Sequence, residues 1–161
     1  MYGVSTPKVV CLSGQGPIYD FSHTCSNTSR FMETAHPVVY IIEDDSSMRR
    51  ALERLVQAAG FDTQSFGSGG EFLASGHGSR PACVVLDLRL PDIHGLEVQR
   101  RLAKTDPSLM VVVVTSYEDE LTRREALGVG AVSFLSKPFD DRILLEAIGR
   151  ALGVSSDEGP P

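Results

Sequence analysis

The chain has 161 residues, of which 42% are hydrophobic and 22% are charged, and its formal net charge at pH 7 is −6. This length suits one ordinary domain with a buried core, and the acidic balance argues against direct contact with nucleic acid, which requires clustered lysines and arginines. The longest apolar run, residues 109–114, is too short to cross a bilayer, and no signal-peptide core is present, so a cytoplasmic protein without membrane contact is expected.

The two ends of the chain differ from its middle. Residues 1–35 have no sustained period of 2 or 3.6 and are rich in serine, threonine, glycine and proline, which predicts a flexible N-terminal extension. Residues 154–161 are polar and end in two prolines, the composition of a C-terminal tail or linker. The organised domain is therefore expected to span residues 36–153.

Strand and helix patterns alternate through this domain. An apolar run at residues 38–42 is typical of a strand buried on both faces, and helical spacing of apolar residues follows over 48–59, with Gly60 as its cap. The remaining predicted elements are, in order, a strand at 62–66, a weak helix at 69–74, a strand at 83–87, a helix at 95–104, a strand at 110–115, a helix at 119–127, a strand at 131–135 and a last helix after the N-cap Asp140.

Five strands that alternate with five helices predict a parallel sheet covered on both faces, which is a three-layer, doubly wound α/β sandwich. A flavodoxin-like strand order, 2-1-3-4-5, would place the switch point between the first and third strands. Ligands of such sheets bind outside the carboxyl ends of the strands near this point, so the residues at those ends are the candidate functional residues.

Acids, a hydroxyl and a lysine stand where four of the predicted strands end. In chain order these residues are Glu43, Asp44, Asp45, Asp87, Thr115 and Lys137. Carboxylates gathered at one edge of a sheet repel one another unless a cation joins them, and their hard oxygen atoms suit Mg²⁺. A carboxylate beside Mg²⁺ can attack a phosphoryl group to give an acyl phosphate, while an ammonium and a hydroxyl contact the phosphoryl oxygens.

The motifs around these residues, in this order and at this spacing, resemble a response-regulator receiver (CheY-like) domain over residues 38–151. The motifs are Val-Tyr-Ile-Ile-Glu43-Asp44-Asp45, Val-Val-Leu-Asp87-Leu-Arg-Leu-Pro91-Asp-Ile-His-Gly95, Val-Val-Val-Thr115-Ser116 and Phe134-Leu-Ser-Lys137-Pro138-Phe139. The details Lys137-Pro-Phe139-Asp140 and Gly130-Ala131 are most similar to the FixJ-type subgroup of regulators.

The resemblance implies that Asp87 is the phosphoacceptor. Thr115 and Lys137 would contact the phosphoryl group, and Phe134 would be the aromatic residue that moves when the domain switches. His94 is interpreted as a loop residue and not as a metal ligand.

The resemblance also implies a Mg²⁺ site. Asp44 and Asp87 would bind the metal directly, the backbone carbonyl of Arg89 would add a ligand, and Glu43 would act mainly through water. The family most often has Asp where this chain has Glu43, which leaves direct ligation by Glu43 open. Asp45 is an additional acid that is expected to stay off the metal.

Three functions compete for this set of residues. The first is a two-component signalling domain, not an enzyme, that accepts a phosphoryl group from a sensor histidine kinase. The second is a haloacid-dehalogenase-type hydrolase, which needs an acid two residues after its nucleophile, where this chain has Arg89. The third is a receiver that is never phosphorylated and serves only as an interaction domain, and the complete set of acids with Thr115 and Lys137 argues against it.

The first function implies a switched surface. Phosphorylation is expected to change the face built from residues 121–127, 131–135 and 142–151, and to promote a homodimer through it, with docking of a monomer on another protein as the alternative. The expected output is control of transcription, either by a single-domain regulator or through a C-terminal DNA-binding effector domain of a longer protein.

Overall fold

The computed structural model describes residues 36–76, 78, 81–116 and 119–154. The predicted N-terminal extension and the tail beyond Val154 lie outside the described residues, so the domain boundaries stay predictions. Within the described part of the chain, no helix has the length and apolar character needed to cross a membrane.

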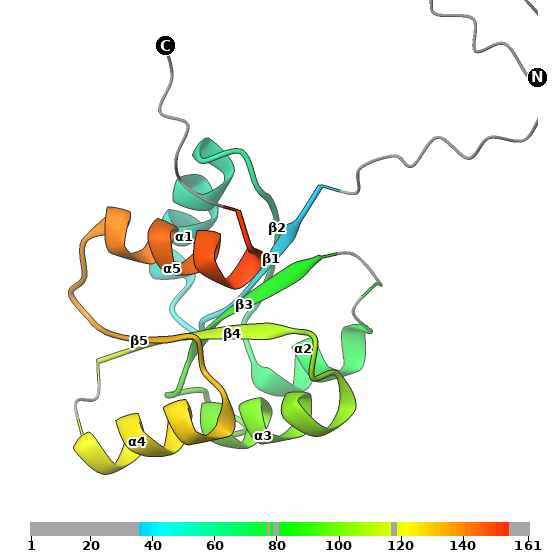
Figure 1. The fold of residues 1–161 in the computed structure, drawn as a ribbon, viewed down its shortest axis with the longest axis vertical. Coiled ribbons are helices and arrows are strands. Elements are labelled where there is room, and N and C mark those ends of the chain that lie inside the picture. The colour runs from blue at the N-terminus through cyan, green and yellow to red at the C-terminus, as the bar shows by residue number, and fades with distance from the viewer. Residues whose placement is uncertain (1–35, 77, 79–80, 117–118, 155–161) are drawn as a thin grey trace, which may run out of the picture. The chain divides into compact units, whose positions relative to one another are not determined.

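Five parallel strands form one sheet in the order β2-β1-β3-β4-β5, and five helices alternate with them (Figure 1). The strands are β1 (Val38–Ile42), β2 (Asp62–Phe66), β3 (Ala82–Asp87), β4 (Met110–Thr115) and β5 (Ser133–Ser136). The helices are α1 (Ser46–Ala58), α2 (Gly69–Ser75), α3 (Gly95–Thr105), α4 (Glu120–Val129) and α5 (Asp141–Leu152). The predicted doubly wound α/β fold and its strand order are confirmed.

The sheet separates two hydrophobic cores. Helices α1 and α5 cover one face and α2, α3 and α4 cover the other (Figure 1). Side chains alternate along each strand, so Val39 and Ile41 enter the first core while Val38, Tyr40 and Ile42 enter the second. Both faces of β1, β3 and β4 are thus buried, which explains why these strands are nearly continuous apolar runs in the sequence.

The boundary between α4 and β5 differs from the prediction. Helix α4 continues through Gly128 and ends at Gly130, whose φ of 113° is left-handed, while β5 begins at Ser133 instead of residue 131. The Ala131 N–H donates to the Ala126 carbonyl at 3.0 Å and so completes the end of the helix. Ala131 is therefore part of the helix cap, and an apolar residue at this place was not a reliable sign of a strand.

Candidate functional site

The carboxyl ends of β1, β3, β4 and β5 meet at one edge of the sheet. In the strand register, Asp87 pairs with Val114 and Thr115 pairs with Ser136, the residue before Lys137. Thr115 is fully buried, and its carbonyl accepts a hydrogen bond from the Lys137 N–H at 2.8 Å. The register of the parallel sheet thus brings residues that are far apart in the chain to one place.

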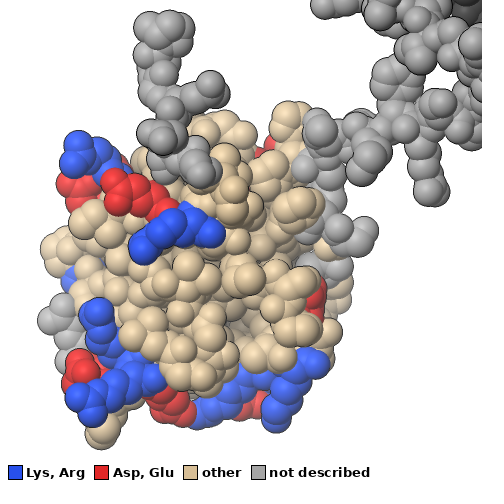
Figure 2. Space-filling view, in the orientation of Figure 1, with Lys and Arg blue, Asp and Glu red and all other residues tan. Residues whose placement is uncertain are grey.

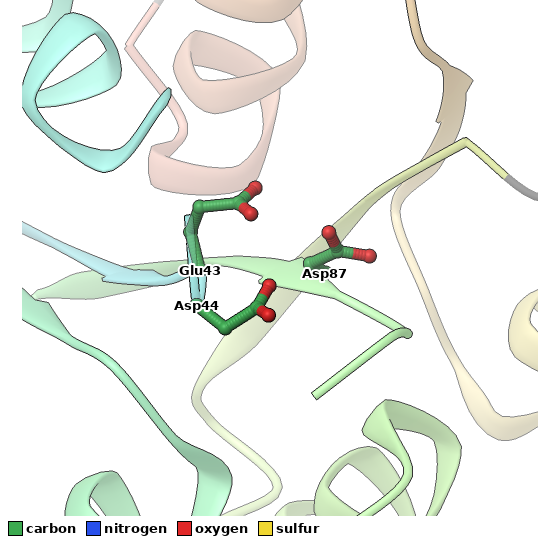
Figure 3. Close-up of side chains that lie close together, drawn as sticks. All are labelled: Glu43, Asp44 and Asp87. Atoms are coloured by element: carbon green, nitrogen blue, oxygen red, sulfur yellow. The ribbon is translucent and has the colours of Figure 1, made fainter. Parts of the chain in front are cut away.

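Glu43, Asp44 and Asp87 form a cluster of carboxylates at this edge. One oxygen of each residue lies within 4.8 Å of the corresponding oxygens of the other two. Figure 3 shows the three carboxyl groups around a common space, two from the segment after β1 and one from the end of β3. Glu43 and Asp87 are buried, with 2% and 4% of their surface exposed, whereas Asp44 is exposed to solvent.

Lys137 joins the two buried acids of this cluster. Its Nζ donates to Glu43 Oε2 at 2.5 Å and to Asp87 Oδ2 at 2.7 Å. The side chain of Lys137 is itself only 12% exposed. Removal of this lysine would leave two buried carboxylates side by side without a compensating cation.

The pKa shifts of Glu43 and Lys137 reflect this contact. Burial raises the pKa of Glu43 above its ordinary value, although the hydrogen bond and charge of Lys137 oppose the rise. Burial lowers the pKa of Lys137, but its hydrogen bonds to Asp87 and Glu43, together with their charges, outweigh burial and raise it. Lys137 therefore remains a cation at neutral pH.

The segment after β3 holds the second oxygen of Asp87. The Arg89 N–H donates to Asp87 Oδ1 at 2.9 Å, so both oxygens of this carboxylate are oriented by hydrogen bonds. The Gly95 N–H donates to the Leu88 carbonyl at 3.0 Å, and a Cβ on Gly95 would lie only 2.5 Å from the Asp87 carbonyl oxygen. Because backbone atoms cannot yield to such a contact, glycine is required where α3 begins beside Asp87.

The residues weighed as secondary candidates have structural roles here. Asp45 is the exposed N-cap of α1, and its Oδ1 accepts from the Ser47 and Met48 N–H groups at 2.9 and 2.8 Å. His94 is the N-cap of α3, with Nδ1 as the acceptor. Phe134 is buried, and the Arg123 guanidinium lies 5.8 Å from its ring centroid.

Two features of the site had not been predicted from the sequence. One is the ion pair between Lys137 and Glu43, which joins residues 94 positions apart. The other is Arg49, whose guanidinium contacts the main chain of the acidic segment. The position of Arg49 six residues after Glu43, on the first turns of a predicted helix, was the only available signal for the second.

The donor set fits Mg²⁺. All the side-chain donors are carboxylate oxygens, which Mg²⁺ prefers. Asp44 is exposed to solvent, and this suits Mg²⁺ because the ion usually keeps several of its water ligands. Three carboxylates and the ammonium of Lys137 have a combined formal charge of −2, which is opposite and equal to the charge of the ion. The carbonyl of Arg89, the further predicted ligand, follows in the turn that holds Asp87.

The family model of the response regulator receiver domain matches residues 39–149. The chain belongs to this family. A receiver domain is a signalling phosphoacceptor and not an enzyme, as the sequence resemblance implied, which decides against the hydrolase alternative.

Several relatives of this receiver are known. Nodulation protein W of Bradyrhizobium diazoefficiens is 40% identical over 111 residues, which are 69% of this chain and 49% of that protein. The transcriptional regulatory protein FixJ of Azorhizobium caulinodans is 35% identical over 121 residues, which are 75% of this chain and 57% of that protein. The crystal structure of FixJ-N has a TM-score of 0.67 at 33% identity and covers 75% of this chain and 97% of its own.

These relatives confirm the predicted similarity to the FixJ-type subgroup. The receiver spans about half the length of the curated relatives it matches, and these homologues are longer proteins.

Proposed function

We propose that this receiver accepts one phosphoryl group on Asp87 in a Mg²⁺-dependent reaction, that a sensor histidine kinase is the donor, and that the output is control of transcription. The observation that supports this most directly is the buried Asp87 carboxylate, which is held 2.7 Å from the Lys137 ammonium within a cluster of three acids. The FixJ relative is a transcriptional regulatory protein, which supports the proposed output.

The proposed reaction uses Asp87 as the nucleophile. An oxygen lone pair of Asp87 forms the new O–P bond while the bond from phosphorus to the donor breaks and its electron pair leaves with the donor. Hydrogen bonds from Arg89 and Lys137 orient the carboxylate before the donor arrives, which lowers the cost of alignment. The Lys137 ammonium and the Thr115 hydroxyl then face the charge on the phosphoryl oxygens.

The metal would be held by the same edge of the sheet. Asp44, Asp87 and the Arg89 carbonyl are the proposed ligands, with Glu43 acting through water because its carboxylate is engaged by Lys137. Mg²⁺ bound there would supply positive charge to the equatorial phosphoryl oxygens.

Intact-mass spectrometry tests the proposed function. Incubation with acetyl phosphate and Mg²⁺ should add one phosphoryl group, and chelation of Mg²⁺ by EDTA should prevent the addition. If neither acetyl phosphate nor a panel of histidine kinases labels the chain, the alternative of a receiver that acts only as an interaction domain replaces this proposal.

Mg²⁺ should stabilise the folded protein, because it binds the folded cluster and relieves repulsion among its carboxylates. At a Mg²⁺ concentration ten times Kd, the expected gain in the free energy of unfolding is about 1.4 kcal/mol. Asp44→Asn should remove most of this gain, and thermal melts with and without Mg²⁺ measure it. The matched control is Asp45→Asn, which removes the neighbouring charge and keeps a capping residue. Equal Mg²⁺ dependence in both variants would show that the metal is bound elsewhere.

Phosphorylation should promote a homodimer through the face of α4, β5 and α5. This face exposes three apolar side chains, Leu121 by 73%, Leu127 by 42% and Ile143 by 47%, which a contact between two copies would cover. It also carries both signs of charge, and Figure 2 shows basic and acidic side chains close together over α4, one of its helices. Such a face suits a self-complementary contact between two copies.

Sedimentation velocity with and without beryllofluoride, a phosphate mimic, measures this change. We expect a monomer without the mimic and a shift to dimer with it, as a population shift of the receiver. Leu121→Glu should block the dimer while labelling by acetyl phosphate is retained. A receiver that stays monomeric with beryllofluoride would favour the alternative, docking of a single copy on another protein.

A further inference from the structure

Arg49 lies in the first turns of α1 and folds back over the start of that helix. Its Nη1 donates to the carbonyl of Glu43 at 2.6 Å and to the carbonyl of Asp44 at 3.2 Å. These two carbonyls belong to the acids that follow β1. The guanidinium also lies beside Gly67, in the segment after β2, at ordinary van der Waals distance from the place of a Cβ.

The position of this cation is unfavourable for the helix alone. The N-terminus of a helix carries partial positive charge, which disfavours basic side chains, and the first turn of α1 contains no acid, so the N-cap carboxylate of Asp45 is the acid of this helix end that interacts with Arg49. The two carbonyl oxygens provide further compensation, because charge-assisted hydrogen bonds are stronger than neutral ones. The contact therefore joins α1 to the main chain of the acidic segment.

Of the three residues between β1 and α1, Asp44 is the one with the fewest constraints. Glu43 is held by Lys137 and by the hydrogen bond from its N–H to the Phe66 carbonyl at 3.1 Å, while Asp45 is held by its capping bonds. No hydrogen bond or ion pair joins the exposed Asp44 carboxylate to another described residue. Two contacts limit rotation of the peptide between Asp44 and Asp45. The Asp45 N–H donates to Glu43 Oε1 at 3.3 Å, and Arg49 donates to the Asp44 carbonyl at 3.2 Å, which joins this peptide to α1.

We propose that Arg49 is a positioning residue for the acidic cluster: it holds the carbonyls of Glu43 and Asp44 so that the Asp44 carboxylate stays beside Asp87. This inference rests on the proposed Mg²⁺-dependent function, because Asp44 is one of the proposed ligands. Arg49 would contact neither the metal nor the phosphoryl group, and it would act by fixing the position of the proposed ligand Asp44.

Two roles of Arg49 predict opposite effects of its removal. If the guanidinium acted only through its charge, Arg49→Ala would make the cluster more negative and would tighten Mg²⁺ binding. If it positions Asp44, Arg49→Ala leaves the ligand free to leave the cluster and weakens Mg²⁺ binding. Changes to residues that orient metal ligands typically cost about tenfold or more in affinity, which exceeds the effect of one solvent-screened charge.

The experiment is a calorimetric titration with Mg²⁺, without a phosphodonor, of the full chain and three variants. Arg49→Ala should weaken Mg²⁺ binding by about tenfold, and Arg49→Lys should weaken it less, since an ammonium reaches the carbonyls only in part. Arg50→Ala is the matched control, because Arg50 is the next residue of α1 and its side chain is exposed. We expect the control to bind Mg²⁺ within about twofold of the wild-type protein.

A second measurement does not depend on the metal. Amide hydrogen exchange over residues 44–46 in EDTA should accelerate in Arg49→Ala, and in Arg49→Lys if the alanine variant does not fold, but not in Arg50→Ala. If the wild-type protein does not bind Mg²⁺ but Arg49→Ala exchanges faster, the proposed magnesium site is wrong. Arg49 would then still be shown to restrain the main chain of residues 44–46. Unchanged exchange, or Mg²⁺ binding by Arg49→Ala that equals or exceeds that of the wild type, would overturn the positioning role.

Discussion

Asp87→Asn should reduce labelling by acetyl phosphate to background. The amide oxygen of asparagine is a much weaker nucleophile than a carboxylate, and an amide cannot form the acyl phosphate by loss of the donor alone. The substitution keeps the size and shape of the side chain, so the contact with Lys137 and the fold should be retained. Intact-mass spectrometry after incubation with acetyl phosphate and Mg²⁺ measures the labelled fraction.

Asp45→Asn is the control for this prediction. Asp45 is two residues from Glu43 but serves as the cap of α1, and asparagine caps a helix about as well as aspartate does. Its labelling should equal that of the wild-type protein. Undiminished labelling of Asp87→Asn, or a phosphopeptide map that places the group on another residue, would show that the phosphoacceptor is misassigned.

Lys137→Met should destabilise the protein by about 3–5 kcal/mol at neutral pH in the absence of Mg²⁺. The lysine is the internal cation of the site, with its Nζ 2.5 Å from Glu43 and 2.7 Å from Asp87. Methionine has a similar length and no charge, so the variant loses the compensation of two buried carboxylates and little packing. Urea unfolding in EDTA measures the loss.

The loss of stability in Lys137→Met should be larger at neutral pH than at acidic pH. Burial already raises the pKa of Glu43, and the hydrogen bond and charge of Lys137, which oppose this rise, are absent in the variant. A folded-state pKa above the unfolded one means that the folded protein binds more protons, so this group contributes stability at low pH that is lost as the pH rises through its folded pKa. The deficit of Lys137→Met should therefore shrink as the pH falls from neutral toward the ordinary pKa of a glutamate.

Lys104→Met provides the comparison, because Lys104 is an exposed lysine at the end of α3. Removing it should change stability by less than about 0.5 kcal/mol at any pH in this range. A Lys137→Met variant that behaves like Lys104→Met would mean that Glu43 and Asp87 do not depend on the buried lysine.

The sequence by itself determined the layers and the edge of the sheet where the acids lie, and it favoured the flavodoxin-like strand order that the structure has. Buried parallel strands are continuous apolar runs and amphipathic helices repeat every 3.6 residues, so β1, β4 and α5 could be located from residues that are neighbours in the chain. The residues at helix ends could also be predicted locally: Asp140 is the N-cap of α5, and Gly60, with a φ of 90°, follows α1. The rule that ligands bind at the carboxyl ends of parallel strands then predicted that the acids, Thr115 and Lys137 lie together in one site.

Only the tertiary structure decided which of these groups touch. Lys137 could have paired with Asp87 alone, and its contact with Glu43 joins the end of β1 to the segment after β5. The turn of Arg49 back to the carbonyls of Glu43 and Asp44, and the requirement for glycine at residue 95, likewise depend on distances between segments that no local period encodes. A sequence pattern reports which side chains are buried, whereas hydrogen bonds are decided by differences of a few tenths of an ångström, which strand register and side-chain rotamers set in the folded chain.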